Sequence, residues 1–406
     1  MFKRVFLLIL DGLGAGAMDE RMPFHTLAHV LEAVPDISIP NLRALGLVSL
    51  LAEEVSWAVR PNLALGKCAL KHEIPDSYIG HQEMMGSDPR RLSMELFSQQ
   101  REKLITCLLE AGYRAVEGPA SILLVDDSVT VGDNMEAPPG MIINVFGSTR
   151  EAPYEKILEI ARVVRADCSN SRVNAMGSGK VQLKDILERA LVRENGQVGI
   201  DAASMDVFGE GYQVTYLGYG FPLAEQAPWA ISQAGHQVVL IGKIAHLIDC
   251  PGVTSEMSID TEVIMERFID ELEYGTAEFV AATVQETDLS GHEKNPVRFA
   301  DTLTLVDSYL ARICEGLGEE DVLIITADHG NDPVAGIGLH TREYTPLIVY
   351  GPSVNGVCLG VRDTLADIGA TIADNFGHLS TEIGQSFLGD LLSTDTRHQE
   401  SCNRRT

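Results

Sequence analysis

The sequence predicts an α/β protein with a doubly wound, mostly parallel sheet as its core and an α+β domain inserted into that core. Two observations predict the core. Short, entirely apolar runs at 5–10 and 321–326 each end in polar residues and glycine, which is typical of parallel strands buried on both faces. Segments with a 3.6-residue apolar period alternate with such runs, and this alternation favours a doubly wound sheet.

The first strand is expected at 5–10. The opening Met1-Phe2-Lys3-Arg4 imitates the charged start of a signal peptide, but the apolar run after it ends at Asp11. The apolar region of a signal peptide usually has about 7–15 residues, so a buried strand fits this short run better. No stretch approaches the ~18 consecutive apolar residues of a transmembrane helix.

More core elements are expected in the C-terminal half. The expected strands are 237–241, 278–284 and 346–350. The expected helices are 261–272, 301–317 and 364–376. Gly377 follows the last of them, at a position where glycine commonly ends a helix.

The middle of the chain has a different pattern. Helical stretches are expected at 99–111, 154–165 and 182–193, and short strands at 122–125, 141–145 and 212–217. Glycine and proline punctuate the whole region. We therefore expect a core at 1–95 and 222–392, an inserted α+β cap domain at 96–221, and a polar tail at 393–406.

Composition excludes several partners. The 406 residues carry a formal net charge of −27, which repels nucleic acid phosphates and anionic membranes. A small anionic substrate remains compatible, because bound cations reverse the local field. The seven cysteines are far apart and form no CxxC pair, so we expect reduced thiols and a cytoplasmic protein.

Residues of the types that bind metals gather in three short segments and at one strand end. They are Asp11, Asp288, His292, Asp328, His329 and His340. Ligands collect at the carboxyl ends of parallel strands, so we expect Asp11, Asp328 and His329 to share one crevice. Three carboxylates and three imidazoles suit Mn²⁺ or Zn²⁺, and Mg²⁺ if carboxylates dominate. Six ligands suffice for two ions about 4 Å apart, which can hold both the attacking and the leaving oxygen of a displacement at phosphorus.

Each residue alone has a simpler explanation. A single Asp after a strand is more often a helix cap, and a single His more often lies on the surface or in a satisfied core. The combination at two strand ends favours metal binding. A nucleophile is available at Ser77, because a hydroxyl bound to a divalent ion becomes a usable alkoxide near neutral pH. By itself, however, the Pro75-Asp76-Ser77 segment is more often a turn.

Several motifs resemble one enzyme family. ADHGNDP (327–333) followed by HTREYTPL (340–347) is similar to the phosphopentomutase branch of the alkaline phosphatase superfamily. Further agreement lies in FLLILDGLGAG (6–16), GHQEMMG (80–86), IGKIAHLIDCPGVT (241–254) and DTLADIGATIADNFG (363–377). The resemblance implies an alkaline phosphatase-like core with a cap domain. It also implies transfer of a phosphoryl group between the 1- and 5-positions of ribose or deoxyribose through a phosphorylated hydroxyl.

The resemblance also implies a division of the ligands. Asp11, Asp328 and His329 would bind one ion, and Asp288, His292 and His340 the other, with Mn²⁺ the most expected metal. In strict alignment Thr287, a poorer ligand, takes the place of Asp288. The spacing of Asp288 and His292 instead resembles the cofactor-independent phosphoglycerate mutases of the same superfamily.

Two more residues take roles from the resemblance. Ser77 stands where the family has its nucleophilic Thr, so it would be both the catalytic residue and a metal ligand. Lys243 matches a lysine expected to contact the substrate phosphate. His81 and Glu83 follow Ser77 closely, and support of the site and simple packing are equally compatible with the sequence. Arg342 and Glu343 are expected to pair and so to orient His340.

The expected activity is that of a phosphopentomutase-like intramolecular phosphotransferase, an isomerase. The substrate would be a small phosphorylated metabolite such as a sugar phosphate. The family's arginine-rich phosphate-binding segment has no counterpart between 172 and 222, and 147–150 replaces its acidic sugar-contacting residue. Two alternatives remain: a phosphatase or phosphodiesterase in which water attacks phospho-Ser77, and an inactive metal-binding paralogue that acts as a binding protein.

Overall fold

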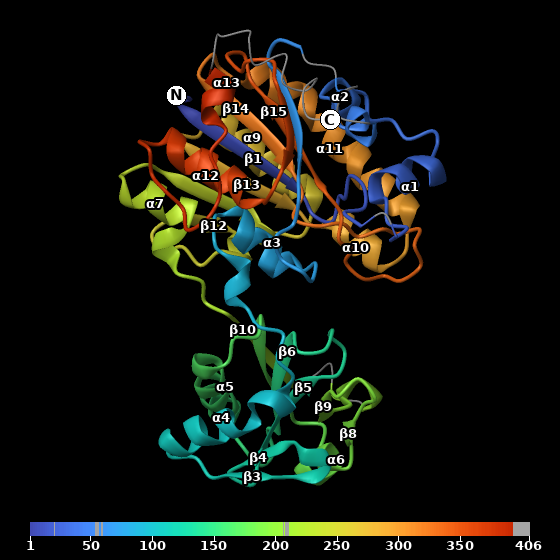
Figure 1. Ribbon diagram of the computed structural model, residues 1–406, viewed down its shortest axis with the longest axis vertical. Helices are drawn as coiled ribbons and strands as arrows, with labels where there is room; N and C mark the ends of the chain where they lie inside the picture. Colours follow the sequence, from blue (N-terminus) through green and yellow to red (C-terminus); the bar gives the residue numbers. More distant parts are fainter. Residues whose placement is uncertain (20, 53–56, 58–59, 206, 208–210, 393–406) are drawn as a thin grey trace. The chain divides into compact units, whose positions relative to one another are not determined.

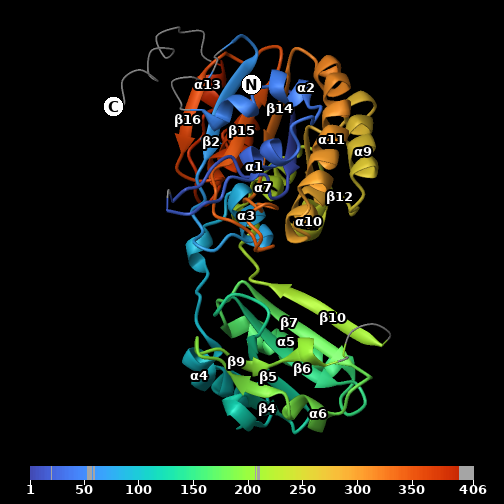
Figure 2. The same cartoon turned by 90° about the vertical axis from the view of Figure 1, so that its right-hand side faces the viewer.

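The structure is a computed structural model, and the residues it describes are 1–19, 21–52, 57, 60–205, 207 and 211–392. The expected tail at 393–406 lies outside them. The chain divides into two compact units (Figures 1 and 2). We call Met1–Pro89 with Pro222–Thr406 the core unit and Arg90–Phe221 the inserted unit. The first division falls after Pro89, where the sequence placed it after residue 95.

An eight-stranded sheet runs through the core unit. Its order is β12 (Thr254–Glu256), β11 (Val238–Gly242), β13 (Phe279–Val284), β1 (Arg4–Leu10), β14 (Asp321–Thr326), β15 (Thr345–Tyr350), β2 (Leu63–Cys68) and β16 (Cys358–Arg362). The first five strands pair in parallel and so do β2 and β16, whereas β15 is antiparallel to both of its neighbours. The mostly parallel α/β class is confirmed.

Successive side chains of a strand point to opposite faces of the sheet, so the sheet has an apolar core on each face. Helices cover both faces. Phe6 and Leu8 of β1 lie in one core, and Leu7 and Ile9 lie in the other. The first core is closed by α1 (Thr26–Ala33), α2 (Pro40–Ala44), α9 (Thr261–Glu273) and α11 (Pro296–Gly316). The second is closed by α3 (Ser77–Met84), α7 (Ala227–Gln233), α8 (Lys243–Leu247), α12 (Ala366–Asn375) and α13 (Leu388–Leu392). Figure 2 shows α9 and α11 side by side along one flank of the sheet.

Helix α11 begins earlier than expected, at Pro296 rather than at residue 301. The side chain of Asn295 accepts a hydrogen bond from the Arg298 N–H at 3.0 Å, and Pro296 occupies the first helical position. Both features are typical of a helix start. The sequence therefore contained this boundary signal, but the apolar period begins later.

The inserted unit has a second sheet. Its main order is β10 (Tyr212–Gly218), β7 (Arg172–Ser178), β6 (Ile142–Ser148), β5 (Val129–Asn134), β4 (Leu123–Val125) and β3 (Ala115–Glu117). In addition, β9 (Val198–Ile200) pairs with β5, and β8 (Ala190–Val192) pairs with β9. Its helices are α4 (Phe97–Glu110), α5 (Tyr154–Asp167) and α6 (Leu183–Leu187). Single 3-10 turns in the chain are η1 (Val48–Leu51), η3 (Pro89–Arg91), η4 (Pro119–Ser121), η5 (Ala202–Ser204) and η6 (Leu223–Glu225).

One expected helix is wrong. The segment 182–193 is helical only to Leu187, after which β8 forms a hairpin with β9. The turn between them contains Asn195-Gly196, with Gly196 at φ +87°. Asn-Gly between two short β runs is a strong hairpin signal, so local turn chemistry overrides the helical pattern here.

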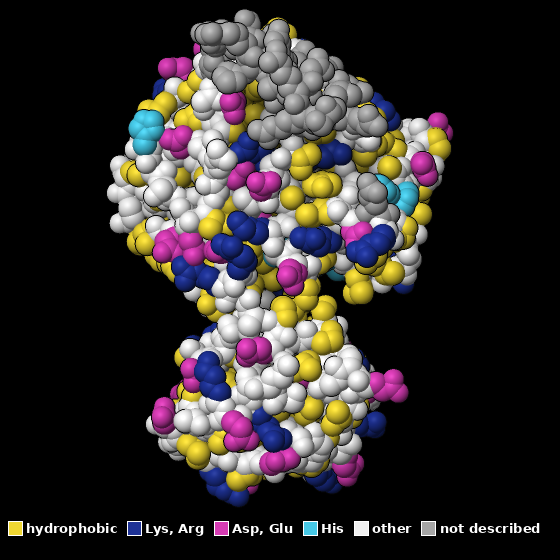
Figure 3. Space-filling model, in the orientation of Figure 1, with side chains coloured by type: hydrophobic (Ala, Val, Ile, Leu, Met, Phe, Trp, Pro, Cys, Tyr) yellow, Lys and Arg dark blue, Asp and Glu magenta, His cyan; other side chains and the backbone are white. Residues whose placement is uncertain are grey.

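The distribution of surface charge and the apolar character of the helices are relevant to the possible partners. On the face shown in Figure 3, acidic and basic side chains lie interspersed, so the negative charge is not gathered in one field there. None of the helices in the described part of the chain combines the length and apolar character needed to cross a membrane.

Candidate metal centre

The sheet brings the predicted ligands together because β13, β1 and β14 are adjacent and parallel. Asp11 directly follows β1, and Asp328 and His329 follow β14. Asp288 lies on α10 (Glu286–His292), which follows β13. Parallel strands end at the same edge of a sheet, so residues more than 270 positions apart become neighbours.

Asp11, Asp328 and His329 form the first ligand group. One ligand atom from each lies within 4.8 Å of the others, and all three side chains are buried. The His329 Nε2 is 3.2 Å from Asp328 Oδ2 and 3.6 Å from Asp11 Oδ1. These are the residues that the sequence assigned to one ion.

The second group differs from the expected one in a single histidine. Asp288, His329 and His340 offer ligand atoms within 4.8 Å of one another, so His329 takes part in both groups. His292 lies at the edge of this group, with its Nε2 3.4 Å from Asp288 Oδ2 and 3.1 Å from His340 Nε2. Its imidazole is more exposed than the other ligands, with 39% of its side chain accessible.

The histidine tautomers fit a metal site. Each Nδ1 faces a backbone carbonyl: Gly330 O for His329, Gly338 O for His292 and Pro75 O for His340, at 3.0, 3.0 and 3.3 Å. A carbonyl can only accept, so Nδ1 carries the proton and a neutral ring has its lone pair on Nε2. Two such lone pairs 3.1 Å apart, on His292 and His340, repel each other unless a proton or a metal ion lies between them. This donor set therefore fits a divalent ion.

The carboxylates have unequal pKa values. Burial raises the pKa of Asp11 well above its usual value, and the charge of Asp328 adds to this. Burial opposes ionisation of Asp328 and Asp288 as well, but nearby histidines and Lys243 hold both of their pKa values below normal. Burial lowers the pKa of His329 to about 4, so at neutral pH its Nε2 is free to bind a metal.

Ser77 is the first residue of α3, which begins beside the metal ligands. Its Oγ lies 2.8 Å from His329 Nε2 and donates to Asp11 Oδ1 at 3.3 Å. Asp76 caps the helix by accepting from the Ile79 N–H at 3.1 Å. The predicted nucleophile is thus in contact with the first ligand group.

Lys243 lies among the ligands rather than apart from them. Its Nζ is 2.7 Å from both Asp11 Oδ2 and Ser77 Oγ, and 3.2 Å from Asp288 Oδ2. Burial disfavours the charged amine, but the carboxylates of Asp11 and Asp288 outweigh burial and raise the Lys243 pKa. The residue is therefore a fixed positive charge beside the Ser77 hydroxyl.

The side chains of Thr287 and Asp288 have different contacts, which distinguishes the two candidate ligands. The Thr287 hydroxyl donates to the backbone carbonyl of Asp11 at 2.6 Å. The Asp288 carboxylate instead faces His292 and His340, with its Oδ1 3.4 Å from His340 Nε2. Asp288 and His292 are four residues apart on α10, so they share one helix face.

Sequence reasoning missed Asn331, although it lies inside the ADHGNDP motif. Its Nδ2 donates to the Asp288 carboxylate and carbonyl at 2.8 and 3.1 Å. A β-carbon on Gly12, which has φ +75°, would lie 3.1 Å from the Asn331 Cβ. Asn331 therefore orients one carboxylate of the second group, and the neighbouring glycine leaves room for it.

His81 and Glu83, whose roles the sequence left open, both hold the nucleophile helix. His81 Nδ1 donates to Ser77 O at 2.8 Å and lies 3.2 Å from Asp328 Oδ2. The Glu83 carboxylate accepts from the backbone N–H groups of Lys71 and His72 at 3.0 and 3.1 Å. These contacts tie α3 to the segment that precedes it.

Glu83 predicts a pH-dependent contribution to stability. Burial by itself raises its pKa, but the hydrogen bond and charge of His72, together with hydrogen bonds from Thr364 and the Lys71 N–H, outweigh burial, so the pKa lies below the usual 4.5. The stabilisation is then present above pH 4.5 and lost as the pH falls through the lowered folded-state pKa. We expect Glu83→Gln to lower the free energy of unfolding by on the order of 2 kcal/mol at pH 7. Urea unfolding in excess chelator, from pH 7 to 4, should show the deficit shrinking at acid pH; a constant deficit would refute this.

The expected Arg342–Glu343 pair is wrong. Arg342 donates instead to the carbonyls of Leu70 and His72, at 2.8 and 3.3 Å. Glu343 accepts from the Thr26 N–H and hydroxyl at 2.9 and 2.6 Å, and from the Thr341 hydroxyl. Successive side chains in extended backbone point to opposite sides, so adjacent residues there do not pair.

Glu343 predicts a large loss of stability when it is shortened. The carboxylate is buried, and burial raises its pKa. We expect Glu343→Ala to lower the free energy of unfolding by about 2–4 kcal/mol, because it leaves buried donors of Thr26 and Thr341 without an acceptor. Glu343→Gln should cost less, and Glu32→Ala, at an exposed position of α1, should be nearly neutral. Urea unfolding of the three variants measures this, and equal effects of Glu343→Ala and Glu32→Ala would contradict it.

Known proteins share the fold described above. Residues 3–379 match the family described as the Metalloenzyme superfamily. A crystal structure of phosphoglycerate mutase from Leishmania mexicana, determined at low cobalt concentration, is 13% identical with a TM-score of 0.54, over 97% of this chain and 98% of that chain. The PH0037 protein of Pyrococcus horikoshii is 16% identical with a TM-score of 0.44, over 95% and 99%. At such identities the first likeness shows a shared fold alone. The family match spans nearly the whole chain, which therefore belongs to the alkaline phosphatase-like Metalloenzyme superfamily.

Proposed function

We propose that this protein is a metal-dependent phosphomutase that moves a phosphoryl group within a small phosphorylated metabolite, through phospho-Ser77. The observation that carries the proposal is the position of the Ser77 Oγ, 2.8 Å from His329 Nε2 and 2.7 Å from Lys243 Nζ. A buried hydroxyl is thus held between a metal-ligand nitrogen and an ammonium. This is the arrangement expected of a nucleophile that accepts a phosphoryl group.

Two divalent ions complete the proposal. Asp11, Asp328 and His329 would hold one, and Asp288 and His340, with His292 or His329, the other. Mn²⁺ is our choice because the ligands mix oxygen and nitrogen, while Zn²⁺ and Mg²⁺ are the alternatives. When bound, such ions supply positive charge against the phosphoryl oxygens.

The protein's own residues account for the transfer. A hydroxyl of the bound metabolite attacks the phosphorus of phospho-Ser77, the bond from phosphorus to Ser77 Oγ breaks, and Oγ takes up the proton that the substrate hydroxyl loses. The Ser77 Oγ then attacks the other phosphoryl group of the bisphosphorylated intermediate. The bond from that phosphorus to the metabolite oxygen breaks, and this oxygen takes up the proton that Oγ loses. The Lys243 ammonium, held beside Oγ, offsets the negative charge that develops in both steps.

We assign substrate selection to the inserted unit. The motifs shared with phosphopentomutases lie in the core unit, whereas the arginine-rich segment of that family has no counterpart between 172 and 222. Because the resemblance holds in the core unit but not in this segment, we propose the broader substrate class of sugar phosphates, of which pentose phosphates are one member.

The test is ³¹P NMR on Mn²⁺-loaded protein. Samples contain ribose 1-phosphate, ribose 5-phosphate or other sugar phosphates, with a trace of the corresponding bisphosphate to phosphorylate Ser77. Interconversion of positional isomers without free phosphate, absent in Ser77→Ala, is the expected result. Accumulation of inorganic phosphate alone would replace the proposal with a phosphatase, and an unchanged rate in Ser77→Ala would remove Ser77 from the mechanism.

A further inference from the structure

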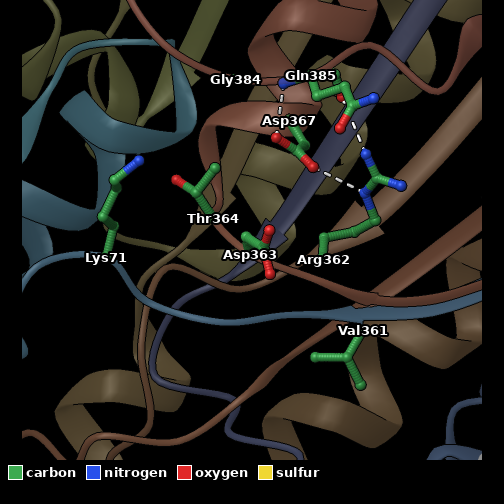
Figure 4. A pocket seen from close by; sticks show the side chains of 8 residues that line it. All are labelled: Lys71, Val361, Arg362, Asp363, Thr364, Asp367, Gly384 and Gln385. Atoms are coloured by element: carbon green, nitrogen blue, oxygen red, sulfur yellow. Dashed lines mark hydrogen bonds and ion pairs between the residues drawn. The ribbon is translucent and has the colours of Figure 1, made fainter.

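A cavity in the core unit is lined by none of the proposed metal ligands. Its volume is about 400 Å³ (Figure 4). Its lining consists of Lys71, Val361, Arg362, Asp363, Thr364, Asp367, Gly384 and Gln385. Ligand-binding clefts typically measure about 300–1,000 Å³, so the cavity has the size of a small-molecule site.

Two of the charged groups in the cavity already have partners. The Arg362 Nε donates to Asp367 Oδ2 at 2.7 Å, and its Nη2 donates to the carbonyl of Gln385 at 3.2 Å. The Asp367 Oδ1 accepts from the Gln385 N–H at 2.7 Å. Figure 4 shows this group on one wall of the cavity. Arg362 and Asp367 are therefore structural parts of the wall, and their charges are already paired within the protein.

Two other charged groups have no partner. Among the residues that the structure describes, neither the Lys71 ammonium nor the Asp363 carboxylate makes a hydrogen bond or an ion pair. Figure 4 shows Lys71 across the cavity from Arg362 and Asp367, with Asp363 between the two walls. The cavity thus offers one unpaired cation and one unpaired anion.

The charges limit the class of ligand. An anion alone would meet Lys71 but also the two carboxylates, and a cation alone would meet Asp363 but also Lys71. An apolar molecule would leave both charges unpaired, because Val361 is the one large aliphatic side chain in the lining. A molecule with a carboxylate and an ammonium pairs both charges. We propose that this cavity binds a small zwitterion of the α-amino acid class, with its carboxylate on Lys71 and its ammonium on Asp363.

The cavity is connected to the nucleophile helix through Glu83. The Glu83 Oε1 accepts from the Lys71 N–H at 3.0 Å, the Thr364 hydroxyl at 2.6 Å and the Leu365 N–H at 3.1 Å. Glu83 and Ser77 belong to the same helix, α3. Thr364 lines the cavity and bonds Glu83 through its side chain, and Lys71 does so through its backbone. A ligand that shifts either residue therefore acts on the helix that positions Ser77, and it changes the rate of phosphoryl transfer. This second part rests on the proposed function, whereas the binding site does not.

Isothermal titration calorimetry on the full chain tests the binding site. The probes are the twenty common L-α-amino acids, each at millimolar concentration. At least one should bind with Kd of about 1 mM or tighter, and Lys71→Gln and Asp363→Asn should each weaken it about tenfold, which is about 1.4 kcal/mol. The matched controls Lys184→Gln and Asp270→Asn change exposed residues and should bind as the wild type does.

Blocked ligands test the charge assignment. The N-acetyl derivative of the bound amino acid loses its cation and the amide loses its anion, so both should bind at least tenfold more weakly. Absence of binding by all twenty probes would overturn the proposal. So would affinity that is unaffected by both Lys71→Gln and Asp363→Asn, or full affinity of either derivative.

Two variants separate this inference from the proposed function. Ser77→Ala should bind the amino acid normally, so binding can be established even if no phosphoryl transfer is found. In active protein, a saturating amino acid should change the transfer rate at least twofold, and Glu83→Gln should keep the binding but lose that response. A response that persists in Glu83→Gln would overturn the connection through Glu83.

Discussion

Replacing Ser77 with alanine should reduce phosphoryl transfer by about three orders of magnitude or more, the scale on which loss of a nucleophile acts. The Ser77 Oγ is the atom that contacts both His329 Nε2 and Lys243 Nζ. Removing it leaves the ligands and the ammonium in place but deletes the phosphoryl acceptor. Kinetics with Mn²⁺-saturated protein, alongside metal content by mass spectrometry, measures both effects.

A conservative variant distinguishes chemistry from folding. Ser77→Thr keeps a hydroxyl on the helix start and should recover most of the activity that Ser77→Ala loses, since the added methyl group leaves the nucleophilic oxygen in place. Both variants should unfold within about 0.5–1 kcal/mol of the wild type. If Ser77→Thr folded as the wild type does but were as inactive as Ser77→Ala, a hydroxyl at this position would not restore activity, and Ser77 would no longer be supported as the nucleophile.

The core was predictable because buried parallel strands are continuous apolar runs. The runs at 5–10 and 321–326 became β1 and β14, which are adjacent and parallel. Their polar ends, Asp11 and the Asp328-His329 pair, were placed at one crevice by the general rule for parallel sheets. Short local signals were thus enough to bring together residues more than 300 positions apart.

The second ligand group was less predictable. Spacing on α10 placed Asp288 and His292 on one face, but it says nothing of how far each imidazole reaches. In the structure, His329 belongs to this group together with Asp288 and His340. The sequence could not indicate this, because it depends on where the 330–340 loop places His340. The choice between His292 and His329 depends on the distances between ligand atoms, which no residue pattern encodes.

Supporting residues were the hardest to predict. Glu83 and Glu343 bind through buried carboxylates to N–H and hydroxyl groups of distant segments, including Thr364 and Thr26. Such partners depend on the tertiary fold, whereas sequence adjacency suggested a contact between Arg342 and Glu343 that extended backbone does not allow. In the inserted unit, a helical apolar period concealed the Asn195-Gly196 hairpin.

Removing metal should cost the protein a large part of its stability. The six proposed ligands belong to the core unit, and three of them are buried carboxylates. The Lys243 ammonium offsets only part of the negative charge of these carboxylates. Binding at 100 times the Kd stabilises the folded state by about 2.7 kcal/mol for each ion. We therefore expect excess Mn²⁺ to raise the unfolding temperature of chelator-treated wild-type protein by about 5–20 °C, at about 2–4 °C per kcal/mol.

Variants of the two ligand groups give this prediction its sharpest form. Asp328→Asn removes one charge from the first group with little change of shape, and Asp288→Asn does the same in the second. Each should bind one ion fewer than the wild type and show about half of its thermal shift, because the other group is left intact. Asp270→Asn, on the exposed face of α9, should retain the full shift and metal content. If Asp328→Asn and Asp270→Asn bound equal amounts of metal, the carboxylates at the ends of β1 and β14 would not form a metal site. Their clustering would then be explained by pairing with the Lys243 ammonium alone.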